Sequence, residues 1–199
     1  MTLTAFSRPL AVMVLLLGLA GCAAYSLVSP AKVAVAGMQV DVEQPWNKVN
    51  QLTVTSSGAI EVWTADGPAL NTIMFIGGAR DGEVAVKSNN PNASGTAIFR
   101  ASMSPGEIVE LWETVIVQQT GTTIAKGSNI KPVKHGGVDG FTFDFAYTGK
   151  NEVEQQGLGY AAIKDKRLYM IFFSGTKLHH FGSRRASVEK MIETVRIAG

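Results

Sequence analysis

The chain has 199 residues, which is the length of one domain with a substantial core. Hydrophobic residues make up 46% of it, charged residues 17%, and the formal net charge is +2. This near-neutral balance excludes the strong basic excess of nucleic-acid-binding proteins, so we expect no nucleic-acid partner. The only cysteine is Cys22, which excludes a disulfide within the domain.

The first 22 residues have the features of an export signal. Arg8 precedes an apolar run, Leu10–Leu19, that is shorter than the about 20 residues a helix needs to span a bilayer. The segment Leu19-Ala20-Gly21-Cys22 ends this run and resembles the lipobox of bacterial lipoproteins. The resemblance implies that residues 1–21 are a cleaved signal peptide and that Cys22 carries the lipid. A secretory signal cut nearby and an uncleaved membrane anchor are the alternatives.

Residues 22–36 are expected to be the lipidated cysteine and a spacer, because the stretch is small, apolar and contains Pro30. Ala23 follows the cysteine where an aspartate could stand. By the lipoprotein resemblance, this implies sorting to the outer membrane, with the protein facing the periplasm. A single domain should then occupy residues 37–199.

The first half of this domain contains β signals and two turns. Residues 38–42 alternate apolar and polar side chains, which predicts a strand, and residues 46–52 after Pro45 are expected to form a short helix. Two β-rich runs, 59–64 and 69–76, flank an Asp-Gly turn and predict a hairpin. A glycine-rich turn at 77–82 and a polar loop at 87–96 should follow.

Residues 105–120 give the clearest helix signal. Ser104, Pro105 and Glu107 have the spacing of a capping box with proline at the first helical position. Gly121 is placed to end the helix. One apolar stripe follows at helical spacing, formed by Ile108, Leu111, Trp112, Val115 and Ile116.

The second half indicates a sheet covered on both sides. Residues 130–135 contain Pro132 and predict an edge strand, while residues 141–147 alternate and place four aromatic side chains on one face. Runs 158–163 and 168–173 form a further hairpin. Because 168–173 is apolar at every position, we expect a layer on each face of the sheet.

A C-terminal helix at 183–194 should supply the second layer, since Val188, Met191, Ile192 and Val195 repeat the helical spacing. Residues 195–197 then predict a final short strand. The fold class is therefore α+β: a single domain with an antiparallel β-sheet sandwiched between helices.

This order of elements, above all the closing segment 168–197, is similar to the fold of the PsbP subunit of photosystem II. A Ran-binding nuclear import factor and several bacterial lipoproteins share that fold. The resemblance implies a PsbP-like fold and favours a protein-binding role, but it transfers no functional residue.

Three histidines are candidates for metal or acid–base chemistry: His135, His179 and His180. The last two are adjacent and would point in opposite directions in a strand, so support for a metal is weak. His135 could approach Asp144 or His180 across the sheet. A glycine-rich stretch at 157–162 precedes a strand rather than a helix, so we expect no dinucleotide and no other cofactor.

Cations are concentrated near one predicted hairpin and the start of the last helix, at Lys164, Lys166, Arg167, Lys177, Arg184 and Arg185. They could present a surface to an anionic glycan or lipid headgroup. Alternatively, they are charges that keep turns hydrated.

Together these features predict a lipid-anchored periplasmic envelope protein that acts as a non-enzymatic binding or assembly factor. Its partners would be the membrane, through the lipid on Cys22, and other envelope components. The alternative is a small-ligand- or metal-binding protein, or a hydrolase, with a pocket near the strand Phe141–Tyr147. His135, or His179 near Ser174, would then supply the polar chemistry.

Overall fold

The computed structural model describes residues 24–198, apart from 53, 89–96 and 150–151. The predicted signal peptide, the lipobox, Cys22 and Ala23 therefore lie outside the described residues, as does most of the expected 87–96 loop. Within the described part of the chain, no helix has both the length and the apolar character needed to cross a bilayer.

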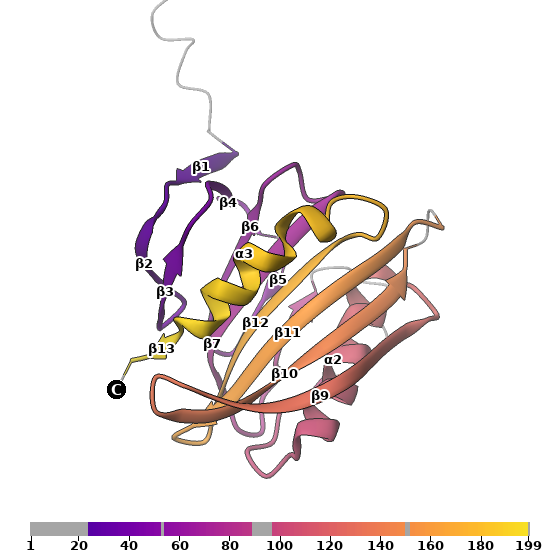
Figure 1. Ribbon diagram of the computed structural model, residues 1–199. Coiled ribbons are helices and arrows are strands. Elements are labelled where there is room, and N and C mark those ends of the chain that lie inside the picture. Colours follow the sequence, from indigo (N-terminus) through magenta and orange to yellow (C-terminus); the bar gives the residue numbers. More distant parts are fainter. Residues whose placement is uncertain (1–23, 53, 89–96, 150–151, 199) are drawn as a thin grey trace, which may run out of the picture.

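The centre of the fold is an eight-stranded antiparallel sheet (Figure 1). Its order is β1 (Tyr25–Val28), β4 (Trp46–Val49), β6 (Ala59–Thr64), β7 (Asn71–Arg80), β12 (Arg167–Thr176), β11 (Glu154–Lys164), β10 (Val138–Thr148) and β9 (Ala125–His135). A three-stranded sheet has the order β13 (Arg196–Ile197), β3 (Met38–Val42) and β2 (Ala31–Val35), and β5 (Val54–Thr55) pairs with β8 (Lys87–Ser88). The hairpins expected from the sequence are confirmed.

The large sheet is covered on both faces, as predicted. Strand β12 directs Met170 and Phe172 into a core beneath helix α2 (Pro105–Thr120). The same strand directs Ile171 and Phe173 into a second core beneath helix α3 (Gly182–Glu193) and the small sheet. The predicted α+β class, with an antiparallel sheet between helices, is therefore confirmed.

Helix α2 is positioned by the capping box read from the sequence. The Ser104 hydroxyl accepts a hydrogen bond from the Glu107 amide at 3.4 Å, and the Glu107 carboxylate accepts one from the Ser104 amide at 2.7 Å. Gly121 ends the helix at φ 66°. Trp112, only 1% exposed, packs its ring 4.9 Å from that of Phe172, so the apolar stripe faces the sheet.

Helix α3 lies on the opposite face and leads into β13, also as predicted. Val188, Met191 and Ile192 are buried against the sheet. The Thr194 hydroxyl accepts a hydrogen bond from the Asp41 amide at 2.9 Å, which ties the end of the helix to β3.

Two expectations for the N-terminal region are wrong. The spacer expected at 22–36 contains β1 and β2, and the short helix expected at 46–52 is strand β4. In β4, Trp46 is buried and packs against Phe173 at 6.1 Å, while the strand pairs with both β1 and β6. These long-range pairings outweigh local propensity, which is a weak determinant in short segments.

The glycine turn expected at 77–82 is also displaced, because Gly77–Arg80 continue strand β7. A Cβ atom at Gly77 would overlap the carbonyl oxygen of Ala36 in the β2–β3 turn. Glycine at 77 therefore lets the small sheet rest directly on the large one.

Candidate functional site

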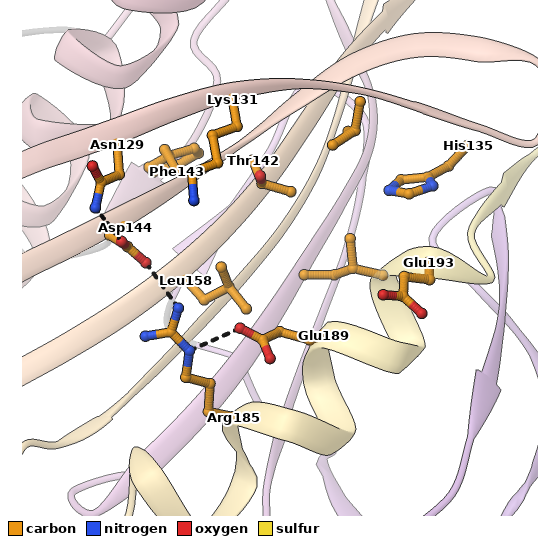
Figure 2. A pocket seen from close by; sticks show the side chains of 12 residues that line it. Asn129, Lys131, His135, Thr142, Phe143, Asp144, Leu158, Arg185, Glu189 and Glu193 are labelled. Carbon is orange, nitrogen blue, oxygen red and sulfur yellow. Dashed lines mark hydrogen bonds and ion pairs between the residues drawn. The ribbon is translucent and has the colours of Figure 1, made fainter.

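A groove with a volume of about 250 Å³ lies between α3 and strands β9, β10 and β11 (Figure 2). We call it the charged groove. Its polar lining comprises Asn129, Lys131, His135, Thr142, Asp144, Arg185, Glu189 and Glu193. Its apolar lining comprises Val133, Phe143, Leu158 and Ile192.

The polar lining follows from the alternation of β10. Phe141, Phe143 and Phe145 belong to the core beneath α2, so the residues between them point to the α3 face. Those residues are Thr142 and Asp144. The pocket expected near the aromatic strand therefore exists, but it opens on the polar side of that strand.

A β-bulge shapes the upper edge of the groove. Thr142 pairs with Lys131, whereas Asp144 pairs with Ser128, so β9 has an extra residue between these pairs. Asn129 adopts φ 51° in the bulge, and its amide donates a hydrogen bond to the Asp144 carboxylate at 2.8 Å. Bulges commonly redirect a side chain in this way.

Arg185 connects the two walls of the groove (Figure 2). Its guanidinium bonds Glu189 on the same helix at 2.8 Å and Asp144 on β10 at 3.4 Å. The hydrogen bond to Glu189 is the main cause that raises the pKa of Arg185 above its ordinary value. Because a guanidinium is always charged, this bridge holds both carboxylates in fixed positions.

Two charged side chains in the groove form no hydrogen bond or ion pair with the described residues: Lys131 on the β9 wall, and Glu193 on the α3 wall, which interacts electrostatically with His135. Counting Arg185, Asp144 and Glu189 as well, the groove carries a formal charge of −1 at neutral pH. At the centre of the groove, the positive charge of Arg185 offsets one of the two negative charges of Asp144 and Glu189. Because these three side chains bond one another, Lys131 and Glu193 are the charged groups available to a ligand.

His135 lies at the same end of the groove as Glu193 (Figure 2). Burial lowers the pKa of His135, a shift opposed by Glu193 and reinforced by Arg196. The imidazole is therefore neutral at pH 7. Its ring lies 5.6 Å from that of Tyr160, whose pKa is raised to about 12 by burial. The buried Tyr160 hydroxyl has no hydrogen-bond partner in the described part of the chain.

The three histidines do not come together. His180 bonds the Thr176 hydroxyl at 2.8 Å in the β12–α3 loop, and its ring lies 5.0 Å from that of His179. His135 instead lies beside the β9–β10 turn, at the end of the sheet where β12 begins. His179 and His180 follow the last residue of β12, at the other end. No group of three His, Cys, Asp or Glu side chains within the described ranges has a metal-binding arrangement. Ser174 bonds Thr72 and Tyr147 rather than a histidine.

The six cations expected to form one basic surface are divided between two ends of β12. This strand has ten residues, so its ends are roughly 30 Å apart. At its start, Lys164 bonds the carbonyl oxygens of Ile197 and Ala198, Arg167 bonds that of Gly78, and Lys166 is exposed in the turn.

At the other end of β12, the cations contact neighbouring side chains. Lys177 pairs with Glu154 at 2.9 Å, and Arg184 lies over the Trp46 ring at 5.3 Å. Arg185 is the one member of the set that lines the charged groove. Cations are unfavourable at the start of a helix, where the helix dipole favours acidic groups, and these tertiary contacts explain why Arg184 and Arg185 are nevertheless found there.

Sequence reasoning missed Asn129, Lys131, Thr142, Glu189 and Glu193. A signal was present for part of this set, because Arg185, Glu189 and Glu193 recur every four residues and so occupy one face of the predicted helix. The contribution of β9 had no such signal, since it depends on the bulge.

No family model and no curated protein matches the chain in sequence. Its structure is similar to that of the cyanobacterial PsbP (CyanoP) from Synechocystis sp. PCC 6803, with a TM-score of 0.53 and 10% identity over 90% of this chain and 96% of that one. A protein of unknown function from Pseudomonas aeruginosa, PA94, gives 0.43 at 9% identity over 86% and 96%. LpqN of Mycobacterium tuberculosis, described as involved in cell envelope biogenesis, gives 0.37 at 6% identity over 91% and 88%. On the first of these similarities, the chain has a PsbP-like fold.

Proposed function

We propose that this chain is a lipid-anchored protein of the cell envelope that binds a partner in the charged groove without catalysing a reaction. Cys22 would carry the lipid, and the domain would face the periplasm from the outer membrane. The lipobox supports the location, and the geometry of the groove supports the binding role.

The observation that carries the binding role is a pair of opposite charges, one on each wall, that form no ion pair with any residue the structure describes. Lys131 and Glu193 flank an apolar lining that includes Val133 and Ile192, while the Arg185 bridge keeps the walls in place. Apolar surface with a few fixed polar groups is the usual composition of a binding site. A partner with an acidic, a basic and an apolar group close together could bind Lys131, Glu193 and the apolar lining at once.

The volume favours a small part of a larger partner. Pockets for drug-sized ligands and cofactors measure about 300–1,000 Å³, and this groove, at about 250 Å³, lies below that range. It has room for one or two side chains of a protein that covers the groove. An assembly or adaptor role is therefore favoured over cofactor binding.

The proposed lack of catalysis rests on the chemistry of the lining. Asp144 and Glu189 both accept hydrogen bonds from Arg185, so each of these carboxylates already has a partner. Thr142 is the only hydroxyl in the lining and no cysteine is present there. No nucleophile hydrogen-bonded to a base occurs in this lining, whereas covalent catalysis requires one.

Site-specific photocross-linking in intact cells tests the proposed site. Benzoylphenylalanine at position 133, which replaces an apolar lining residue and leaves Lys131 and Glu193 in place, should give a protein adduct that the same residue at position 166, exposed in the β11–β12 turn, does not give. Glu193→Lys should abolish the adduct while leaving the melting temperature unchanged. Equal adducts at both positions, or an adduct unaffected by Glu193→Lys, would contradict the assignment.

A small zwitterionic molecule is the second candidate ligand, since Lys131 and Glu193 offer one charge of each sign. Thermal melting of the protein with a panel of amino acids would then show a shift that Lys131→Glu removes. Metal analysis belongs to the same experiment, because bound zinc at His135 would favour the metal-binding alternative.

The anchor is tested separately by mass spectrometry of the protein purified from membranes. The expected mass lacks residues 1–21 and includes acyl chains on Cys22. Cys22→Ser should leave the leader uncleaved. A processed Cys22→Ser protein that still partitions with membranes would refute the proposed anchor.

A further inference from the structure

Exposed apolar side chains are concentrated at one end of the molecule. Four of the large hydrophobic residues with the greatest exposure in the described ranges lie there: Tyr25 at 44%, Leu27 at 70%, Leu70 at 38% and Leu178 at 99%. We call this set the apolar end. The three others, Val117, Ile124 and Ile130, lie on or beside α2 and β9.

The elements that carry the apolar end come from three parts of the chain and are linked by strand pairing and hydrogen bonds. Leu27 pairs with Asn47, whose amide donates a hydrogen bond to the Ala65 carbonyl at 3.4 Å. Next along this edge, the Leu70 carbonyl accepts a hydrogen bond from the Thr176 amide at 3.0 Å, two residues before Leu178. Figure 1 shows β1, the β6–β7 turn and the β12–α3 loop together at the top of the molecule.

Leu178 is held outward by a structured turn. The Thr176 carbonyl accepts hydrogen bonds from the amides of His179 and Phe181, and the Thr176 hydroxyl bonds the His180 ring. Phe181 is itself buried and stacks on Phe173 at 5.5 Å. These bonds fix the backbone of the loop that presents Leu178 to solvent. Insertion of Leu178 into lipid would therefore cost little conformational entropy.

The short distance from Cys22 to this end identifies what covers it. The Ala24 carbonyl already accepts a hydrogen bond from the Asn50 amide at 3.0 Å, and β1 begins at Tyr25. Cys22 comes two positions before Ala24, and two positions span at most roughly 7 Å. An acylated Cys22 would therefore bring the apolar end into contact with the bilayer, because no spacer remains to separate them.

The opposite end has the reverse character. The β11–β12 turn carries Asp165 and Lys166, the end of β7 carries Arg80 paired with Glu83, and the β9–β10 turn carries the pair Lys134 and Asp139. None of the exposed large hydrophobic residues lies in these turns. The charged turns are suited to contact with water, and the apolar end is suited to contact with lipid.

We propose that the apolar end docks on the same bilayer that holds the anchor, with Leu178 inserted at the boundary between headgroups and acyl chains. The proposal rests on the proposed lipidation of Cys22. Lys177 and the histidines beside Leu178 would remain at headgroup level, as polar groups do at a membrane interface. The domain would then have one fixed orientation on the membrane instead of being tethered loosely above it.

A fluorophore at position 178 tests the contact. The full-length protein is isolated from membranes as Leu178→Cys, whose new thiol is the only one free when Cys22 is acylated, and is labelled with an environment-sensitive dye. It is then reconstituted in phosphatidylethanolamine–phosphatidylglycerol vesicles. Labels on Lys166→Cys, at the opposite end, and on Ile124→Cys, exposed but remote from the anchor, are the controls.

We expect the label at 178 to emit at shorter wavelength and to be quenched by nitroxide-bearing lipid, with neither effect at 166 or 124. The same result in purely zwitterionic vesicles is expected, since the contact is apolar. Aqueous emission at 178 in protein whose acyl mass is confirmed would overturn the docking alone. A missing acyl mass would overturn the anchor and the docking with it, and a dependence on anionic lipid would overturn apolar insertion.

Discussion

The two faces of the large sheet differ in what they contribute. Beneath α2 the face is apolar and closely packed: Phe172 packs against both Trp112 and Phe143, and all three are nearly excluded from solvent. Beneath α3 the core is equally apolar near β12, but it gives way to the charged groove near β9. Strand β10 borders both, with aromatic residues on one side and Thr142 and Asp144 on the other.

This difference indicates a division of labour: the α2 face determines stability, whereas the polar part of the α3 face determines binding. Substitutions on the first should lower the free energy of unfolding, and substitutions on the second should change binding at nearly constant stability. The following variants test this division, beginning with the largest effect.

Trp112→Ala should have the largest effect, because it removes a buried indole from the α2 face. The expected loss is about 3–5 kcal/mol of unfolding free energy, measured by urea denaturation. A change near zero would show that the α2 face is not the stabilising one.

Gly159→Ala should cost about 1–3 kcal/mol, since the added Cβ would lie within the Phe143 ring and displace it. Gly137→Ala is the control for the loss of a glycine without such a clash, because nothing lies near its Cβ position, although its φ of 81° adds strain of its own. The signature that separates them is a change in near-ultraviolet circular dichroism, which only the displaced Phe143 should produce.

Arg185→Ala should change stability little and binding strongly, in contrast to the two substitutions above. Its side chain is 43% exposed and its partners Asp144 and Glu189 are 31% and 44% exposed, so the loss of stability should stay below about 1 kcal/mol. The photocross-link at position 133 should nevertheless disappear, because the two walls lose their bridge. Arg167→Ala, remote from the groove, should leave the cross-link intact.

The smallest effects are those of pH, and the two faces should again differ. The hydrogen bonds from Ser104 lower the pKa of Glu107, so the cap of α2 should weaken as the pH falls below the ordinary value of 4.5. Burial lowers the pKa of His135, so its contribution is complete above pH 6.5 and is lost as the pH falls below that value. Thermal melting at a series of pH values measures both effects. Glu107→Gln should reduce the dependence of the melting temperature on pH below 4.5, and His135→Gln should reduce it just below pH 6.5.

Much of the fold was predictable because it depends on local patterns. Helix α2 follows from Ser104, Glu107 and one apolar stripe, and β10 follows from strict alternation. The prediction failed for β4 and for the segment that forms β1 and β2, since these strands have weak patterns of their own and are stabilised by partners remote in sequence. The turn predicted to begin at Gly77 was wrong for the same reason, because Gly77 lies within β7 and packs against Ala36, which is remote in sequence.

The site divides in a similar way. The face of α3 that bears Arg185, Glu189 and Glu193 was readable as a repeat of four residues, whereas Asn129 and Lys131 enter the groove only through a bulge in β9. Bulges depend on the register of two strands, which no single segment encodes.

The amino-acid sequence by itself predicted the layered α+β class and the capped helix, and it contains a segment that resembles a lipobox, because each of these depends on residues that are neighbours along the chain. Only the tertiary structure decided which cations share a surface, which carboxylates flank Arg185, and which exposed apolar side chains lie at one end of the sheet. Those features depend on strand order and register, which bring residues more than a hundred positions apart to the same end of the sheet.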